Sequence, residues 1–470
     1  MSSSVFFVLL VMILPTTSVS ASFPEGFIFG VANAPGQVED NLSDIWLDWG
    51  KQGKIRTWTQ TKAPEERLQF WTKPEIELNL AQELGANSFR LGVDWGRVMP
   101  KKDQFDEQSL LHYLKIIKMA KSRDMSIMLT LMHHSVPKWV QEQGGWHNIE
   151  TKKDFIQFSK KMISLFHDHV DWWITFNEAN VFVTMAYTAG IWPPGEKRSP
   201  LSMTALGPFR GDSIKAMDHM SDSHNEIYDW AHKKYPKIKM GLAHNMANYT
   251  GKSFIDRLKA SFVSKVMNWR FPENVRGRMD FFGFNYYGAE WLKGTQIDID
   301  PEEEYSEAGR AIDVNGLYDI LKEIHIRFKD LPIIITENGI ADAKDAIRPA
   351  YHIEHLHAVQ KALEEKIPIL GYYVWSLTDN LEWSDGYCPK FGLVAVDRVT
   401  MERKPRMSFD VMKTIIQTRS ISPELKKTVW DQVLSYQGKD RLFCKDHDGI
   451  TSYDEPKIRQ FVKKDWRFNR

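Results

Sequence analysis

Residues 332–338 have the sequence Pro-Ile-Ile-Ile-Thr-Glu-Asn, a short apolar run that ends in polar side chains. Its apolar residues are continuous rather than alternating, which is typical of a strand covered on both faces, as in a parallel sheet. Seven more runs of this kind, each bounded by turn residues, occur along the chain: 27–32 (FIFGVA), 88–93 (SFRLGV), 127–131 (IMLTL), 172–176 (WWITF), 238–243 (IKMGLA), 281–287 (FFGFNYY) and 369–377 (ILGYYVWSL).

Helical patterns lie between many of these runs. An alternation of eight buried strands with helices predicts the α/β class, and within it a single (β/α)8 TIM barrel. The rival architecture is a doubly wound sheet, but no GxGxxG turn follows the first strand. The helical patterns cover residues 74–84, 110–121, 152–167, 212–234, 316–328 and 351–365.

The composition of the 470-residue chain limits both its architecture and its partners. No repeat or Gly/Ser linker divides the sequence, and single barrels run from about 200 to over 400 residues. Sixty-one Lys and Arg residues balance sixty-one Asp and Glu residues, so no net charge attracts nucleic acid or an anionic membrane. The hydrophobic content of 43% excludes a disordered scaffold. The two cysteines form no zinc motif, and the 17 Trp are typical of an aromatic cleft wall.

The first residues differ from the rest of the chain. An apolar run, Val5–Leu14, is too short for a membrane span of about 20 residues, and Pro15 and small residues at 18–21 follow it. This order predicts a signal peptide over residues 1–21 and a secreted protein, extracellular or lumenal. No Lys or Arg precedes the run, so an uncleaved anchor or a frayed helix is the alternative. No later segment approaches an integral membrane span.

Secretion would give two other features a meaning. Asn41 and Asn248 each begin a sequon for N-glycosylation, which predicts a glycoprotein. Cys388 and Cys444 could pair in an oxidising compartment, a question that the sequence leaves open.

Polar residues cluster at or just after the ends of the strand runs. In an α/β barrel, these positions open onto the catalytic face. A chance scatter would not favour one rim so consistently, so we expect these side chains to share a site. In chain order they are Gln37, Glu39, Arg90, His133, His134, Asn177, Glu178, Asn285, Tyr287, Glu337, Asn338, Trp375, Glu382 and Trp383.

Two of these residues, Glu178 and Glu337, follow different strands and could face each other across the barrel mouth. One carboxyl group could protonate a leaving oxygen while the other attacks the carbon beneath it. Arg90 could keep the attacking carboxylate ionised, and Tyr287 could orient it. Indole rings suit the C–H face of a sugar, and amides and imidazole suit its hydroxyl groups.

Each of these residues, taken alone, has a simpler interpretation. A single glutamate at a strand end is usually a salt-bridge partner, and His133 alone would be an interior histidine. Arg90 alone would be a structural ion-pair former, and the tryptophans would be core residues. Gln37 and Asn177 alone would be caps or loop anchors. The functional interpretation therefore depends on the joint placement of all of them at one rim.

At these positions the sequence resembles glycoside hydrolase family 1, the retaining β-glycosidases. The similarity extends from Phe23 to about Ser420. Four strings in the family's order carry it: residues 27–32 leading to Gln37 and Glu39, residues 175–178 (TFNE), residues 335–339 (ITENG) and residues 375–383 (WSLTDNLEW).

The resemblance implies a role for each matching position. Glu178 would be the general acid/base and Glu337 the nucleophile, with a covalent glycosyl-enzyme intermediate and no metal or cofactor. Arg90 and Tyr287 would support Glu337, and Trp375 would form the floor under the sugar. The sugar hydroxyls would be held, and the pocket braced, by Gln37, His133, Asn177, Asn285, Glu382 and Trp383.

The sequence departs from the family pattern at three places. His134-Ser135 stand where an aromatic residue and Asp usually occur, Ala179 replaces a proline, and Asp40 replaces a glycine. Together with residues 89–100, His134-Ser135 resemble the plant freezing-tolerance galactolipid galactosyltransferases. Gln37 and the short segment between Trp46 and Phe70 instead resemble the hydrolases.

The sequence therefore predicts a secreted retaining β-glycosidase that hydrolyses β-D-glucosides or β-D-galactosides. The alternative is a β-glycosyl transferase that uses the same two glutamates, with a lipid glycoside as possible substrate or acceptor. The barrel would span residues 22–420, and a C-terminal extension, residues 421–470, would pack on it through Trp466 and Phe468. A non-catalytic barrel and a metal-dependent hydrolase are disfavoured, because both glutamates are present and Gln37-Val38-Glu39 replaces a His-x-His ligand set.

Overall fold

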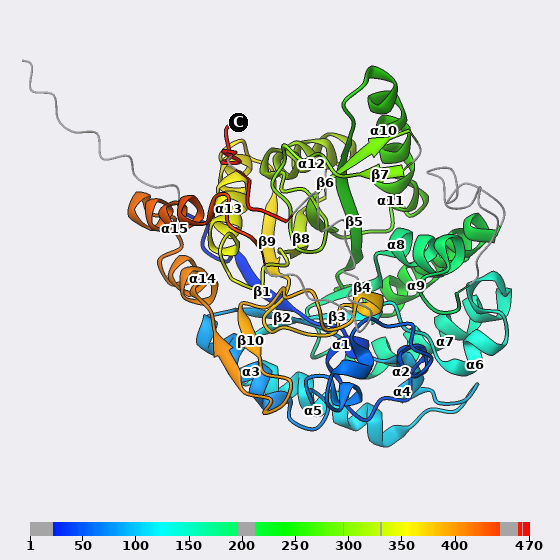
Figure 1. Ribbon diagram of the computed structural model, residues 1–470. Coiled ribbons are helices and arrows are strands. Elements are labelled where there is room, and N and C mark those ends of the chain that lie inside the picture. Colours follow the sequence, from blue (N-terminus) through cyan, green and yellow to red (C-terminus); the bar gives the residue numbers. More distant parts are fainter. Residues whose placement is uncertain (1–21, 196–211, 295, 330, 442–458, 463) are drawn as a thin grey trace, which may run out of the picture.

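The computed structural model describes residues 22–470 except 196–211, 295, 330, 442–458 and 463. In this part of the chain, eight parallel strands form a closed ring surrounded by helices, which confirms the predicted (β/α)8 barrel (Figure 1). The strands of the ring are β1 (Ile28–Ala32), β2 (Ser88–Gly92), β3 (Ser126–Met132), β4 (Trp172–Asn177), β5 (Met240–Thr250), β6 (Phe282–Lys293), β8 (Ile333–Asn338) and β9 (Ile369–Val374).

The ring closes between strands that are far apart in the sequence. β1 pairs with β9 in parallel, with Ile28 opposite Gly371 and Val31 opposite Val374. On the other side of the ring, β5 pairs with β6, with Asn245 opposite Asn285. No strand of the ring lacks a neighbour on either side, so its backbone groups are satisfied by the ladders.

The continuous apolar runs are explained by burial on both faces of each strand. One small cluster contains Met128, Ile174, Ala243, Ile334 and Tyr373, which come from five strands of the ring and fill its interior. A much larger cluster lies between the outer face of the strands and the helices. A strand between two apolar layers has no polar face, which is why the sequence pattern is continuous rather than alternating.

The helices begin and end where the sequence provides local signals. Asp106, Asn148 and Asp313 cap α5, α7 and α12 by accepting backbone N–H groups, and Gly85 ends α3 with a φ of 88°. The α-helices are α1 (Pro35–Val38), α2 (Ile45–Lys51), α3 (Pro74–Leu84), α4 (Trp95–Val98), α5 (Glu107–Lys121), α6 (Lys138–Glu142), α7 (Ile149–Phe166), α8 (Ala179–Thr184), α9 (Asp212–Lys234), α10 (Phe254–Met267), α11 (Arg270–Asn274), α12 (Val314–Arg327), α13 (Arg348–Glu364), α14 (Met407–Thr418) and α15 (Pro423–Tyr436).

Two antiparallel strand pairs lie outside the ring of the barrel. β6 continues beyond the ring and pairs in antiparallel fashion with β7 (Gln296–Asp298). β10 (Val394–Val396) and β11 (Arg403–Pro405) form a separate two-stranded sheet after the last strand of the ring. The β6–β7 hairpin and the long β5 extend past the rim of the barrel, where they pack against α10.

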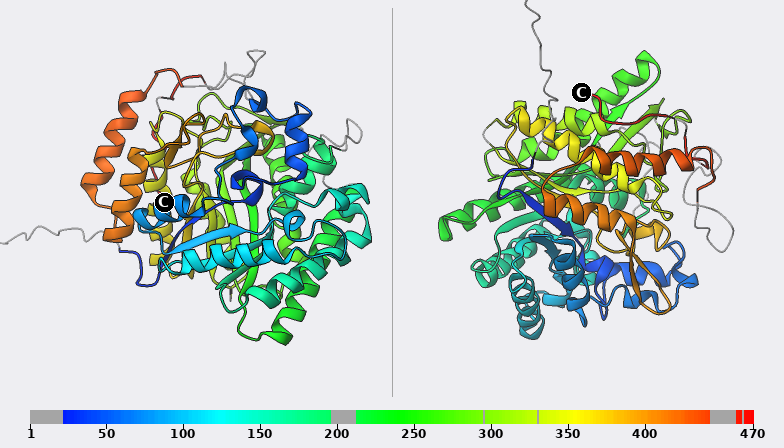
Figure 2. Two further views of the ribbon diagram at one scale, coloured as in Figure 1. Left: turned by 90° about the horizontal axis from the view of Figure 1, so that it is seen from below. Right: turned by 90° about the vertical axis from the view of Figure 1, so that its left-hand side faces the viewer.

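The last helices lie together on one side of the barrel. Figure 2 shows α14 and α15, in orange, side by side in both views. Buried Glu354 of α13 binds this region: its carboxylate accepts from Trp430 Nε1 at 2.7 Å, Lys426 Nζ at 3.0 Å and the backbone N of Phe468 at 3.0 Å. Trp466 packs on Trp430 with ring centroids 4.6 Å apart. The division at Ser420 stays a prediction.

Candidate active site

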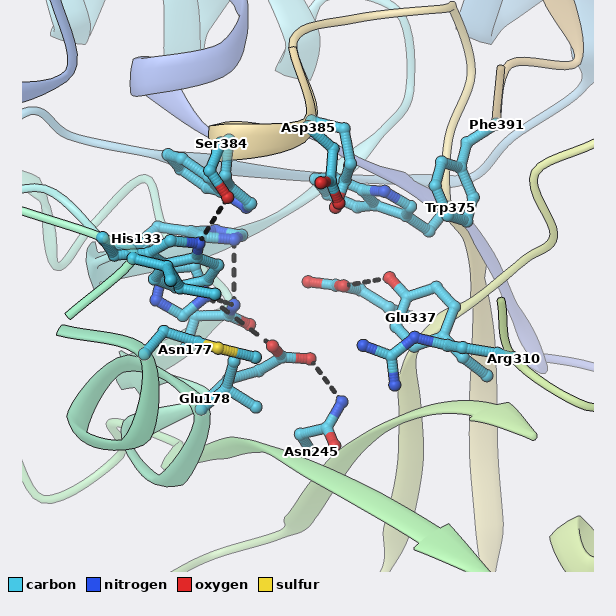
Figure 3. A pocket seen from close by; sticks show the side chains of 18 residues that line it. His133, Asn177, Glu178, Asn245, Arg310, Glu337, Trp375, Ser384, Asp385 and Phe391 are labelled. Carbon is cyan, nitrogen blue, oxygen red and sulfur yellow. Dashed lines mark hydrogen bonds and ion pairs between the residues drawn. The ribbon is translucent and has the colours of Figure 1, made fainter. Parts of the chain in front are cut away.

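A pocket opens at the end of the barrel where the parallel strands finish. It brings together most of the side chains that the sequence singled out, and Figure 3 shows them directed toward a common space. The residues that line it are His133, His134, Asn177, Glu178, Val181, Met185, Ile191, Trp192, Asn245, Tyr287, Arg310, Glu337, Trp375, Glu382, Trp383, Ser384, Asp385 and Phe391.

The carboxyl group of Glu337 is held by one donor on each oxygen. Glu337 lies near the end of β8, where Arg90 Nη1 donates to Oε1 at 2.6 Å. The Tyr287 hydroxyl donates to Oε2 at 2.6 Å. Arg90 is completely buried, so its charge acts on Glu337 with little screening by water. These contacts fix the orientation of the Glu337 carboxyl group.

Glu178 is the first residue after β4, and its carboxyl group has a different set of neighbours. Its Oε1 accepts from Asn285 Nδ2 at 2.8 Å and from Asn245 Nδ2 at 3.0 Å. Its Oε2 lies 3.6 Å from His134 Nε2. The two glutamates therefore sit in distinct environments, one beside a guanidinium and a phenol and the other beside amides and an imidazole.

Asn177 connects the two environments. Its Oδ1 accepts from Arg90 Nη2 at 2.6 Å and from Asn285 Nδ2 at 3.0 Å. These two donors fix the orientation of the amide, so its Nδ2 faces His133 Nε2 at 2.9 Å and His134 Nε2 at 3.3 Å. A continuous chain of hydrogen bonds thus links Glu337 to Glu178.

The pKa values of the two carboxyl groups are shifted in opposite directions. Burial, opposed by Arg90 and reinforced by the charge of Glu178, raises the pKa of Glu337 to about 7. Burial also acts on Glu178, but the contact with His134 and the two amide hydrogen bonds outweigh it and lower the pKa of Glu178 to about 2. Because each carboxyl group affects the charge of the other, the two groups titrate as a pair.

Three pocket residues other than glycine have a left-handed backbone. The φ angles are 59° at His134, 44° at Glu178 and 46° at Trp383. Residues with a side chain seldom adopt this conformation, and when they do they cluster at functional sites. The surrounding barrel holds these three backbones in place, which aims their side chains into the pocket.

The other end of the pocket has the groups that a polyhydroxylated ligand needs. Gln37 Nε2 donates to Glu382 Oε2 at 3.5 Å, and the rings of Trp375 and Trp383 lie 5.9 and 5.8 Å from that of His133. Among the described residues, buried Gln37 Oε1 and His133 Nδ1 have no hydrogen-bond partner. Buried polar atoms are normally paired, so these two are available to a ligand.

Glu382 is tuned to be neutral. Burial, together with the charges of Asp385 and Glu337, raises the pKa of Glu382 to about 8. A protonated carboxyl group donates one hydrogen bond and still accepts others, which suits a ligand with adjacent hydroxyl groups.

The pocket residues that the sequence did not single out include Asn245 and Arg310. Asn245 follows the apolar run 238–243 by two positions, the same offset that identified other rim residues, so a signal existed. Arg310 lies in the connection between β7 and α12, where no pattern marks it; its Nη1 donates to Glu290 at 3.0 Å. His134 was noted as a departure from the family pattern, without a role in the site.

An α/β barrel with two buried carboxyl groups in a pocket of amides, imidazoles and indoles has the architecture of the barrel glycosidases. Comparison with known families agrees with this class. The model of Glycosyl hydrolase family 1 matches residues 19–271 and 270–421, and this chain belongs to that family.

Three relatives extend the comparison. A chloroplastic galactolipid galactosyltransferase of Arabidopsis thaliana is 32% identical over 94% of this chain and 82% of its own length. A chloroplastic β-glucosidase-like protein of Oryza sativa subsp. japonica is 36% identical over 97% and 85%, respectively. The solved β-glycosidase from Pyrococcus horikoshii has 30% identity and a TM-score of 0.77, covering 87% of this chain and 98% of that one. The predicted branch of the family is therefore confirmed.

The prediction of a secreted protein is wrong, because both plant relatives are chloroplastic by name. The error has a physical origin: a short apolar run followed by small residues does not by itself specify a compartment. The sequence before Val5 also lacks the basic residues of a secretory signal. Residues 1–21 lie outside the described residues.

The structure describes part of the two features that the sequence linked to secretion, the sequon at Asn248 and the pair of cysteines. Asn248 Nδ2 donates to Asp313 Oδ2 at 2.6 Å, so the amide that a glycan would need is already engaged. Cys388 is disulfide-bonded, and Cys444 lies outside the described residues.

Among the helices that the structure describes, none is both long and apolar enough to cross a membrane. The expectation that no metal or cofactor is needed stays a prediction.

Proposed function

We propose that the protein is a retaining β-glycosidase that hydrolyses β-D-glucosides or β-D-galactosides. The observation that carries this proposal is the pair of carboxyl groups in contrasting environments, Glu337 beside Arg90 and Tyr287, and Glu178 beside asparagine amides and His134. Membership of Glycosyl hydrolase family 1 supports it.

In the first step, the Glu337 carboxylate attacks C1 of the sugar while Glu178 donates its proton to the glycosidic oxygen. The bond between C1 and that oxygen breaks, the aglycone leaves as an alcohol, and an ester joins the sugar to Glu337. Arg90 and Tyr287 stabilise Glu337 as an anion before the attack and again when the ester is cleaved.

In the second step, Glu178 acts as a base. It takes a proton from a water molecule as the water oxygen attacks C1, which releases the sugar with its original configuration and restores the Glu337 carboxylate. Gln37, His133 and neutral Glu382 bind the sugar hydroxyls, and Trp375 lies under the ring.

Catalysis in this scheme requires Glu178 to carry a proton and Glu337 to be ionised when a glycoside binds. The glycosidic oxygen beside Glu178 accepts that proton, and the positive charge that develops at C1 stabilises Glu337 as an anion. The transition state thus favours the productive distribution of the proton.

Proton NMR during turnover of nitrophenyl β-D-glucoside and β-D-galactoside tests the proposal. We expect the free sugar to appear first as the β anomer, before mutarotation, and the faster substrate to identify the preferred sugar. An α anomer appearing first would reject retention, and no release of sugar would reject hydrolysis.

A transferase is the second candidate, and one observation favours it: the similarity to a galactolipid galactosyltransferase over 94% of this chain. The first step would be the same, and a hydroxyl of a second glycolipid would replace water in the second. Adding a galactolipid acceptor to the NMR sample distinguishes the two, because new glycosidic signals without free sugar would establish transfer.

A further inference from the structure

One cation lines the pocket, and the proposed function gives it no role. Arg310 is the only Arg or Lys among the described residues that line the pocket. Its side chain is 33% exposed, so the guanidinium borders the space that a ligand would fill. The same lining contains four carboxyl groups, those of Glu178, Glu337, Glu382 and Asp385.

The backbone of Arg310 is fixed against β6. Its N–H donates to Ser306 Oγ at 3.1 Å, and its carbonyl accepts from the backbone N of Ser306 at 2.9 Å. The carbonyl of the next residue, Ala311, accepts from the backbone N of Ala289 at 3.0 Å. The two segments approach so closely that a Cβ on Gly288, whose φ is 143°, would collide with the Ala311 carbonyl. Arg310 therefore has a defined position at the pocket.

The side chain of Arg310 is held on one edge only. Its Nη1 donates to Glu290 Oε1 at 3.0 Å, and its guanidinium carbon lies 5.5 Å from the centre of the Tyr287 ring. A guanidinium has five N–H donors in a planar fork. Among the described residues, no acceptor pairs with Nε or Nη2 of Arg310. These donors are left for a ligand.

Arg310 lies on the side of the pocket where an aglycone would leave. In the proposed function Glu178 protonates the glycosidic oxygen, so the group bonded to that oxygen lies beside Glu178. Asn245 donates to Glu178 at 3.0 Å, and Figure 3 shows Arg310 and Asn245 across the pocket from Trp375 and Asp385. Trp375 is the residue under the sugar in that scheme, so Arg310 faces the group beyond the sugar.

The charges around Arg310 favour a neutral ligand. Burial opposes the charge of Arg310, but Glu290 and Glu178 outweigh it and raise the pKa of Arg310, so the guanidinium stays charged. Glu290 balances that charge within the ion pair, and the other carboxyl groups of the pocket repel an anion. Hydroxyl oxygens accept hydrogen bonds from a guanidinium without adding charge to the site.

From these observations we infer that Arg310 determines specificity for the aglycone by donating hydrogen bonds to its hydroxyl groups. The favoured aglycone is neutral and hydroxylated, as a second sugar is. Val181, Met185 and Ile191 also line the pocket, but apolar side chains contact the carbon atoms of any aglycone, so the discrimination falls to Arg310. This inference rests on the proposed function, which places the glycosidic oxygen. An acceptor enters where the aglycone leaves, so the same contact favours a hydroxylated acceptor over water.

Calorimetric titration of the full chain carrying Glu337→Gln tests the inference without turnover. The ligands form two pairs that share a sugar and differ in the aglycone: cellobiose with phenyl β-D-glucoside, and lactose with phenyl β-D-galactoside. In the pair that binds, adding Arg310→Met should weaken the disaccharide by about tenfold or more, because charged donors are lost. The phenyl glycoside, which has no hydroxyl on its aglycone, should weaken by no more than about twofold.

Glu290 provides the control for a purely structural role of Arg310. Glu290→Gln keeps an acceptor for Arg310 and removes the ion pair, so the ratio of the two affinities should not change. The double variant Arg310→Met with Glu290→Gln leaves no carboxylate without its cation and should behave like Arg310→Met. The matched control outside the pocket is Arg270→Met, because Arg270 is 31% exposed and lies 3.5 Å from Asp218. Thermal unfolding establishes that every variant is folded.

Three results would overturn the inference: equal losses for the disaccharide and the phenyl glycoside in Arg310→Met, the same selective loss in Glu290→Gln, or no binding of either disaccharide. Failure of the proposed function is a separate result, because hydrolysis is measured by NMR on the parent chain. A selective loss in Arg310→Met with no hydrolysis by the parent chain would reject hydrolysis and leave the assignment of Arg310 in place.

Discussion

At the scale of single residues, the properties of the pocket follow from which donor lies beside which carboxyl group. Arg90 and Tyr287 lie beside Glu337, whereas His134 and two asparagines lie beside Glu178. The consequences are best tested by substitutions that change one contact at a time.

Replacing the attacking carboxylate is the most direct test. Glu337→Gln keeps the volume and the hydrogen bond from Tyr287 but removes the nucleophilic oxygen, so we expect kcat to fall by at least about a thousandfold. The thermal unfolding temperature should stay within a few degrees of that of the parent protein. Substantial turnover by a correctly folded variant would remove Glu337 from the nucleophile role.

The role of Glu178 depends on the leaving group. Glu178→Ala should slow glycosides with poor leaving groups far more than nitrophenyl glycosides, because only the former need protonation in the first step. Added azide should then restore part of the turnover of activated substrates by replacing water at C1. A loss that is equal for all leaving groups and is not rescued by azide would argue against an acid/base role.

His134 provides a prediction of pH dependence. Its contact lowers the pKa of Glu178, so His134→Phe, which introduces an aromatic residue, should raise that pKa. Raising the pKa of one member of the pair moves the titration of the pair upward, and the pH profile of kcat/KM should therefore shift to higher pH. Ser135→Ala, at the adjacent position, is the control and should leave the profile unchanged. A shift to lower pH would contradict the assignment.

The candidate site could be predicted in large part because its residues follow strand ends. Asn245 was missed although it follows a strand run as the other rim residues do, and Arg310 because a connection without periodicity gives no information about where it folds back. The opposite pKa shifts of the two glutamates could not be predicted either, since burial and the contact with His134 exist only in the folded chain.

At the scale of elements, the sequence located the ring strands to within a few residues, because two apolar layers leave a continuous pattern. It failed where β5 and β6 leave the barrel. Beyond Ala243 and Tyr287 these strands mix polar and apolar residues without a regular period, which looked like loop sequence. Helix α10 was not among the predicted helices.

The contact between α13 and the C-terminal region can be tested at Glu354. Burial raises the pKa of Glu354, but hydrogen bonds from His357 and Trp430 and the charge of Lys426 outweigh it, and the net pKa is lowered. Glu354→Gln should reduce the free energy of unfolding by about 1–3 kcal/mol at neutral pH, because the buried ion pair and its hydrogen bonds are lost. Thermal unfolding measures this change.

The difference in the free energy of unfolding between the parent protein and Glu354→Gln should depend on pH. A lowered pKa means that Glu354 stabilises the folded chain above the pKa of the unfolded chain, and that this contribution is lost as the pH falls through the folded value. The difference between the parent and Glu354→Gln should therefore shrink in acid. The control is Glu364→Gln on the same helix, where an exposed pair with Lys361 at 3.7 Å contributes little. A difference that grows in acid would contradict the assignment.

At the scale of the whole molecule, the C-terminal region is connected to the pocket. Arg441 forms a buried ion pair with Glu304, whose other oxygen accepts from the backbone N of Val462 at 3.0 Å. Glu304 lies in the same connection as Arg310, and its carbonyl accepts from the backbone N of Ile312 at 2.8 Å. The residues after Ser420 therefore stabilise the segment that places Arg310 in the pocket.

Truncation after Ser420 should affect both stability and binding. Glu304 and Glu354 would lose their cations while staying partly buried, so we expect the unfolding temperature to fall by several degrees or more. The KM for nitrophenyl glycosides should rise more than kcat falls, because the segment with Arg310 would be loosened while the two glutamates keep their own contacts. An unchanged unfolding temperature would show that the region after Ser420 does not stabilise the barrel.

The pairing of β1 with β9 also constrains how the protein is made. Val31 lies opposite Val374, so β1 has no partner on this edge until the ribosome has added more than three hundred further residues (374 − 31 = 343). During that interval the outer edge of β1 is an open template for other chains. A chain that ends before residue 369 would therefore leave this edge of β1 unpaired and could not close the ring.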